Sequence, residues 1–189
     1  SKHNCIECGL CEKVCPVLNQ KEEKELEIEA FAVKNKEESQ RKNSSSGGVF
    51  IALANQVIEE GGVVCGAKFD KDFHLIHDFA QTKEELKPLM GSKYLQSDMK
   101  DCYKKVKNYL LQERLVLFVG TPCQVMGLKL FLRKEYDNLL AVEVVCHGVP
   151  SPLVWEKYLE EVCKRKKISL NEIENISFRN KDKSWRVFN

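Results

Sequence analysis

The fold class is decided by the stretch Leu115-Val116-Leu117-Phe118-Val119-Gly120-Thr121-Pro122-Cys123. Its five consecutive apolar residues predict a strand that is buried on both faces, and the glycine and proline that follow end it. A helix is expected from about Gln124 to Lys134, followed by a second apolar strand over 139–145. Strand, crossover helix and strand form the βαβ unit of a parallel sheet. The sequence therefore predicts an α/β fold, with a mixed or mostly parallel sheet flanked by helices.

The segments on both sides of this unit fit the same kind of sheet. Residues 49–60 have the apolar spacing of a helix, with serines before them and two glycines after them. Strands are expected over 63–69 and 75–79, joined by a polar turn. The remaining expected elements are a short helix that opens on the capping box Thr82–Glu85, a helix over 99–113, a helix from Ser151 to about Lys164, and a strand over 173–179.

Cys123 and Cys146 each follow one of the two apolar strands. Ligands in open parallel sheets bind at the carboxyl ends of the strands. If the two strands are neighbours, both thiols face one crevice. Three interpretations stay open at this point: ligands of a second metal cluster, a redox-active dithiol, or buried small hydrophobes. We favour a site role, because a thiol and the imidazole of His147 are unusual packing groups at a strand end.

The N-terminus carries the run Cys5-x-x-Cys8-x-x-Cys11-x-x-x-Cys15-Pro16. Thiolates at this spacing suit an iron–sulfur cluster, and the run matches that of bacterial ferredoxins. A zinc knuckle is the alternative, but it usually needs two separated cysteine pairs. We therefore expect a 4Fe-4S cluster on a small ferredoxin-like segment. In two-cluster ferredoxins the fourth cysteine ligates the other cluster, so Cys15 either completes this cluster or served a second one that the sequence lacks.

Composition narrows the class of protein. The 189 residues include 30 Lys and Arg against 28 Asp and Glu, so the chain lacks the excess of positive charge that is typical of nucleic-acid-binding proteins. The apolar runs are too short to span a bilayer. Nine cysteines without an export signal indicate metal or redox use in the cytoplasm rather than a disulfide framework. We expect an iron–sulfur segment over 1–18, a solvated connector over 19–43 with one short strand at Ile28–Val33, and an α/β domain over 44–189.

Four further motifs, together with the cysteine run, resemble one family, the beta subunit of coenzyme F-420 hydrogenases and dehydrogenases. The motifs are Ser44-Ser45-Ser46-Gly47-Gly48-Val49-Phe50, Gly91-Ser92-Lys93-Tyr94-Leu95-Gln96-Ser97, Gly120-Thr121-Pro122-Cys123-Gln124 and Cys146-His147-Gly148-Val149-Pro150-Ser151. A weaker fifth motif is Phe178-Arg179-Asn180-Lys181 with Trp185. The resemblance covers nearly the whole chain. It implies an iron–sulfur flavoprotein that passes electrons between its cluster and FAD, with hydride exchange between the flavin and a deazaflavin coenzyme or another small reducible substrate.

The resemblance also implies roles for individual residues. Ser44, Ser45, Ser46, Gly47 and Gly48 would open a helix whose amides bind the flavin phosphates; a plain helix N-cap is the alternative. Further cofactor-binding residues would be Ser92, Lys93, Tyr94, Gly120, Thr121 and Pro122. Lys93, Cys146 and His147 would be catalytic, with Lys93 stabilising negative charge on the reduced flavin and Tyr94 stacking on its ring. Cys123 and Cys146 would ligate metal at the flavin edge.

Two departures from the family pattern bear on how much of the site is present. Similar members carry two cysteine runs and continue well past the fifth motif, so we expect this chain to be a fragment whose flavin domain is truncated at its C-terminus. The expected partner is a redox protein or subunit, either ferredoxin-like or a hydrogenase or dehydrogenase. Two rival functions remain: an electron-transfer or adaptor subunit without its own catalysis, and a thiol redox enzyme that uses Cys123 and Cys146.

Overall fold

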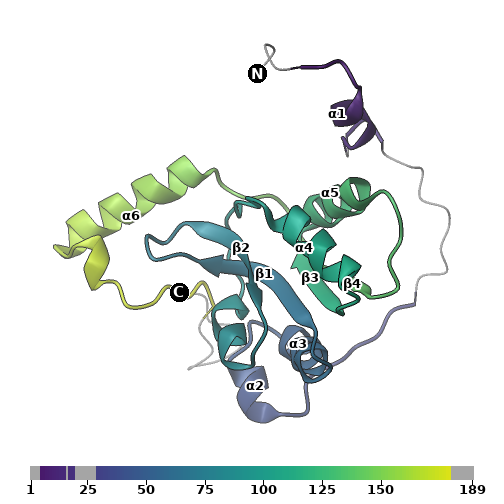
Figure 1. Ribbon diagram of the computed structural model, residues 1–189. Coiled ribbons are helices and arrows are strands. Elements are labelled where there is room, and N and C mark those ends of the chain that lie inside the picture. Colours follow the sequence, from purple (N-terminus) through teal and green to yellow (C-terminus); the bar gives the residue numbers. More distant parts are fainter. Residues whose placement is uncertain (1–4, 16, 20–28, 180–189) are drawn as a thin grey trace.

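The centre of the molecule is a four-stranded sheet with the strand order β2-β1-β3-β4 (Figure 1). The structure is a computed structural model, and it describes residues 5–15, 17–19 and 29–179. The strands are β1 Val63–Phe69, β2 Leu75–Ala80, β3 Val116–Gly120 and β4 Leu139–Glu143. β1 pairs with β2 antiparallel and with β3 parallel, and β3 pairs with β4 parallel. This confirms the predicted α/β class with a mixed, mostly parallel sheet.

Helices cover both faces of the sheet. On one face, α3 Val49–Glu59 and the 3₁₀ helix η2 Glu84–Leu89 pack against alternate residues of β1 and β3. On the other face, α4 Cys102–Leu111 and α5 Pro122–Leu132 pack against Cys65, Val116 and Phe118. β3 is buried on both sides because successive side chains of a strand point to opposite faces. This burial is why its sequence is apolar throughout.

A third apolar cluster lies at the end of the β1–β2 hairpin. The long helix α6 Pro152–Lys166 places Trp155 and Leu159 there, against Leu75 and Leu95. The Trp155 ring stacks on Phe69 at 6.0 Å, and its indole N–H donates to the Phe73 carbonyl. After α6 the chain forms the 3₁₀ helix η3 Leu170–Glu172 and then packs onto the same cluster.

Two expected strands are not formed. Residues 173–179 contain no strand, because Ile173, Ile176 and Phe178 pack on the α6 cluster instead of joining the sheet. The short strand expected at Ile28–Val33 is also absent over residues 29–33, and Ile28 lies outside the described residues. These residues precede a short helix, α2 Glu38–Lys42. Their apolar side chains are exposed, so they lack the partner strand and the covering layer that a strand needs.

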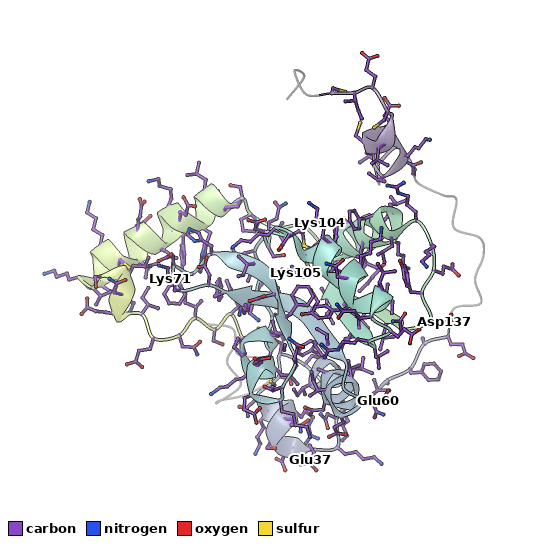
Figure 2. The ribbon with its side chains drawn as sticks, in the orientation of Figure 1. Glu37, Glu60, Lys71, Lys104, Lys105 and Asp137 are labelled. Atoms are coloured by element: carbon purple, nitrogen blue, oxygen red, sulfur yellow. The ribbon has the colours of Figure 1, made fainter. Side chains whose placement is uncertain are left out.

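The surface of the described part is charged and one edge of its sheet is open. Figure 2 shows labelled charged side chains, such as Glu37, Lys71 and Asp137, at the periphery of the molecule. β4 forms one edge of the sheet, and Leu140 in its middle is 39% exposed. Among the described residues, no helix has the length and apolar character that crossing a bilayer requires.

Candidate functional site

The turn between β3 and α5 is built as a complete helix cap. Thr121 is the N-cap, Pro122 occupies the first helical position, and Gln124 closes a capping box with Thr121. The Thr121 amide donates to Gln124 Oε1 at 3.0 Å. A Cβ at Gly120 would lie 3.1 Å from that same oxygen, so a larger residue there would have to displace the Gln124 amide. The helix therefore begins two residues earlier than the apolar pattern predicted.

Cys123 and Cys146 lie just past the carboxyl ends of β3 and β4, on the same end of the sheet. The two strands are neighbours in register, with Gly120 opposite Glu143. The Val144 amide donates to the Gly120 carbonyl at 2.9 Å, which ties the loop that carries Cys146 to the turn that carries Cys123. Both cysteines are free and exposed, as is His147. Their exposure rules out the interpretation of Cys123 and Cys146 as buried packing residues.

The triple-serine motif has a different local role from the predicted serine N-cap. The N-cap of α3 is Gly48, with a φ of 79°, and no side chain caps this helix end. Ser44 instead donates to the Gln40 carbonyl at 2.7 Å, at the end of α2. A Cβ at Gly47 would lie 2.9 Å from the Val33 carbonyl oxygen. The two glycines therefore let the chain before α3 pack closely, and the amides of the first turn of α3 remain without a side-chain cap.

The second motif lies directly beside the first. The Ser92 amide donates to Ser45 Oγ. Next to it, Lys93 Nζ donates to the carbonyls of Met90 at 2.8 Å and Gly91 at 3.2 Å. Burial lowers the pKa of Lys93 to about 8, because desolvation disfavours the charged form. In the described part of the chain, no carboxylate lies within ion-pair distance of this ammonium.

A buried polar network joins the second motif to the third. His77, on β2, has Nδ1 2.8 Å from Ser97 Oγ and Nε2 3.1 Å from the Val119 carbonyl oxygen. Gln124 Nε2 donates to the same Ser97 oxygen at 2.8 Å. Burial lowers the pKa of His77, and the nearby Lys93 charge lowers it further. The network thus connects a buried imidazole in the sheet with the turn at Thr121–Gln124.

The fifth motif contacts the second through an aromatic pair. The Tyr94 ring meets Phe178 edge-to-face at 5.6 Å, and Phe178 also contacts Trp155. Tyr94 is 50% exposed, so one part of its ring is open to a ligand. Asn180, Lys181 and Trp185 lie outside the described residues. Hydrogen bonds and ring contacts therefore link the first, second, third and fifth motifs, and the fourth motif follows two residues after Val144, which is bonded to Gly120.

A cavity of about 570 Å³ opens beside this region. It lies between the β1–β2 turn, residues 95–100 and the start of α6, and Ser97 of the network lines it. Its size is within the range of small-molecule sites. Its other lining residues are Asp70, His74, Leu75, Ile76, Leu95, Gln96, Asp98, Met99, Lys100, Pro152 and Trp155.

The N-terminal cysteine run is curled and accessible. Glu7 and Gly9 have positive φ angles of 54° and 66°, and the chain then forms the short helix α1 Leu10–Lys13. Asn19 closes the next turn by donating to the Glu12 and Cys15 carbonyls. All four cysteines are free; the first three are exposed and Cys15 is half-buried. Free, accessible thiols are what an iron–sulfur cluster needs, because its ligands are cysteine thiolates.

The sulfur spacing does not match a zinc site. Four thiolates around one zinc ion lie about 3.8 Å apart, given a Zn–S bond of about 2.3 Å. Within the described ranges, the one group of three or more metal-ligating side chains at such spacing is Asp70, Asp72 and His74, which contains no cysteine.

Sequence reasoning missed the central residues of the site. His77 was given no role, although it contacts both Ser97 and Val119. Its signal was its place two residues after Leu75, on the inward face of a strand. Ser97 and Gln124 ended two of the motifs, but nothing in the sequence showed that they would meet across the fold.

Two other cysteines form a buried pair. Cys65 Sγ on β1 lies 3.0 Å from Cys102 Sγ at the start of α4, and neither residue is more than 1% exposed. Burial raises the pKa of Cys65 well above its ordinary value, and the hydrogen bond with Cys102 raises it further. Thiols in such surroundings are unreactive packing groups.

Comparisons with known proteins agree with the motifs. Two family models match, both describing the beta subunit of coenzyme F420 hydrogenase/dehydrogenase: its N-terminal part matches residues 30–103, and its C-terminal part matches residues 113–188. Solved structures also match, including a chain of the F420-reducing NiFe hydrogenase complex from Methanosarcina barkeri. That match has a TM-score of 0.57 and 18% sequence identity, so it shows the fold alone. It covers 80% of this chain and 56% of the Methanosarcina chain. The curated protein sequences give no match.

Proposed function

We propose, because this chain belongs to the coenzyme F420 hydrogenase/dehydrogenase beta subunit family, that it is an oxidoreductase that passes electrons between an iron–sulfur cluster and FAD. Bound FAD would supply hydride exchange with a deazaflavin coenzyme or another small reducible substrate. The observation that carries the proposal is the set of contacts between the family's separate motifs near the carboxyl ends of the strands. These contacts lie beside the half-buried Lys93, which has no carboxylate partner among the described residues.

The cluster would be a 4Fe-4S cluster held by Cys5, Cys8, Cys11 and Cys15. Their exposure and the curled backbone at Glu7 and Gly9 support this part. Cys123 and Cys146 offer two more exposed thiols at the sheet edge. We propose these two as ligands of further metal near the flavin, since soft thiolates at a strand end suit iron.

The FAD would bind where the first two motifs meet. The first-turn amides of α3, together with Ser45, Ser46 and Ser92, would bind the pyrophosphate, because the positive end of a helix dipole attracts an anion. Gly47 and Gly48 would serve this site indirectly, by letting residues 33–41 pack behind the helix start. A further contact with the cofactor would come from the capped start of α5. The residues there are Gly120, Thr121 and Pro122.

Bound FAD would supply the exchange between two-electron and one-electron carriers. Lys93 would then stabilise negative charge on the cofactor, because its ammonium is half-buried beside neutral carbonyl groups. The exposed part of Tyr94 would stack on the ring. Cys146 and His147, on the loop tied to Gly120, would face the reacting edge.

The substrate and the redox partner would approach at the same edge. The cavity lined by Ser97 and Trp155 is large enough for a small reducible molecule. A partner protein or subunit would deliver or remove single electrons at the exposed cysteine run. The match to one chain of a multi-subunit hydrogenase complex supports a subunit role.

Anaerobic purification followed by iron–sulfide and FAD reconstitution tests the proposal. We expect the flavin absorption bands together with a broad cluster shoulder, and measurable iron and flavin per chain. Cys8→Ser should remove the cluster signal while leaving the flavin bands. Cys163→Ser is the matched control, because Cys163 is buried in α6 away from the run, and it should keep both signals.

The same experiment separates the rivals. Cluster uptake without flavin would replace the proposed function by an electron-transfer or adaptor subunit. Activity that survives iron chelation and disappears on alkylation of Cys123 and Cys146 would replace it by a thiol redox enzyme. Iron content in Cys15→Ser decides whether that residue completes the cluster.

A further inference from the structure

The hydrogen bonds around His77 fix which ring nitrogen carries the proton when the ring is neutral. The Val119 carbonyl oxygen can only accept, so the ring nitrogen beside it, Nε2, must carry a proton and donate. In a neutral imidazole the other nitrogen, Nδ1, is then an acceptor. It receives the hydroxyl proton of Ser97, and the Ser97 oxygen in turn accepts from the Gln124 amide.

The same logic fixes the Gln124 side chain. Its Oε1 accepts from the Thr121 amide, so its nitrogen must be the atom that points at Ser97. The donors therefore run in one direction, from Gln124 to Ser97 to His77 to Val119. Each polar atom along this line has a partner, which is the condition for a buried network to give a rigid, unique arrangement.

The network joins segments that are far apart in the sequence. The His77 backbone amide donates to the Asp98 carbonyl, and the Asp98 amide donates to the Leu75 carbonyl, so residues 97–98 lie along the open edge of β2. The His77 ring stacks on Phe118 of β3 at 5.6 Å. The imidazole thus holds the loop that carries Lys93 on one side and the turn that carries Cys123 on the other.

We infer that His77 is a positioning residue, which in its neutral, Nε2-protonated form fixes the Lys93 loop and the Cys123 turn relative to each other through Ser97 and Gln124. The inference rests on the proposed function only for what these two segments do once they are fixed. His77 itself has no path to a ligand, because it is 5% exposed and both ring nitrogens are bonded. Its buried position and the charge of Lys93 both favour the neutral ring.

Two cofactor-free measurements on the full chain test the inference. Nitrogen-15 NMR of the histidine rings should show His77 with a protonated Nε2 and an unprotonated Nδ1 at pH 7, identified by the signal that His77→Gln removes. Hydrogen exchange should then be compared for the amides of residues 91–98 and 119–124 in wild type, His77→Phe and Ser97→Ala. Phenylalanine keeps the stack on Phe118 and loses both hydrogen bonds.

We expect both variants to raise exchange in the two segments by a similar factor of about fivefold, the equivalent of one lost hydrogen bond. The double variant should add little to either single change, because the residues act as one network. Val106→Ala is the matched control: it removes buried volume next to Phe118 without touching the network. It should raise exchange in the slow core amides. In residues 91–98 and 119–124, exchange should rise only by the amount that the lower global stability explains.

Three results would overturn the inference. A protonated Nδ1 or a charged ring at pH 7 would contradict the direction of the network. Unchanged exchange in Ser97→Ala would show that His77 acts through packing alone, as would equal effects from Val106→Ala. Failure of the wild-type chain to take up FAD would instead count against the proposed function, because none of these measurements uses a cofactor.

Discussion

At the scale of single residues, Lys93 is the group on which pH should act. Its pKa of about 8 in the free chain means that it loses its charge as the pH rises through that value. A bound anion would favour the charged form, so FAD affinity should be highest below pH 8 and fall above it. We expect a loss of roughly tenfold, the size of one charge-assisted hydrogen bond. Fluorescence titration with FAD between about pH 6.5 and 9.5 measures this.

Lys93→Gln is the control for that titration. The amide keeps donors that can reach the Met90 carbonyl but carries no charge. This variant should bind FAD weakly at every pH and should show no step near pH 8. A wild-type affinity that stays flat across pH 8 would remove Lys93 from the anion site.

Thiol reactivity is a second property that belongs to single residues. In the folded, metal-free chain, iodoacetamide should label Cys123 and Cys146 readily, because both are exposed. Cys65 and Cys102 should be labelled only after denaturation, since they are buried and the pKa of Cys65 is raised. Mass spectrometry of digested samples measures both rates. Equal labelling of all four before denaturation would contradict the packing of β1 against α4.

At the scale of elements, the cap of α5 connects the buried strand β3 with the helix turn that carries Cys123. Thr121→Ala removes the side chain of the N-cap and should lower the free energy of unfolding by about 1 kcal/mol. Thr121→Ser keeps the hydroxyl and should cost much less. Urea denaturation followed by circular dichroism measures the difference. If alanine and serine behave alike, the capping box contributes nothing to stability.

Strong local patterns made most elements predictable from the sequence. β3 and β4 were found because their apolar runs end at clear stop residues, and α5 because Pro122 and Gln124 are typical of a helix start. The segment over 173–179 was predicted wrongly as a strand, since an apolar run does not say whether it joins a sheet or packs on a helix. Here the neighbouring Trp155 provides the apolar surface that residues 173–178 cover.

The site was only partly predictable for the same physical reason. Motifs at helix and strand ends indicated which segments could form a site, because the end of an element leaves backbone groups free. Contacts between segments were not predictable: the Ser45–Ser92 bond joins residues 47 positions apart, and the His77–Val119 bond joins residues 42 apart. Such pairs depend on how loops, helices and non-adjacent strands pack in three dimensions, which one sequence does not reveal.

At the scale of the whole molecule, the iron–sulfur segment and the α/β core should be separable. None of the three apolar clusters of the described part includes a residue from the cysteine run. Removing the cluster with a chelator, or by Cys8→Ser, should therefore leave the thermal unfolding of the core unchanged. This differs from zinc fingers, in which metal binding drives folding. Differential scanning calorimetry measures it, and a clear drop in Tm on chelation would show that the two parts fold together.

The open side of β4 has a consequence for how this chain behaves at high concentration. A terminal strand presents a row of unmatched peptide groups, and in β4 they lie beside the exposed side chain of Leu140. Proteins usually protect an edge strand with lysine, proline or a covering segment. Among the described residues no further strand pairs with β4, so two molecules can pair along this strand and precipitate. Leu140→Lys would keep the chains apart and leave the opposite side of the sheet, where His77 lies, untouched.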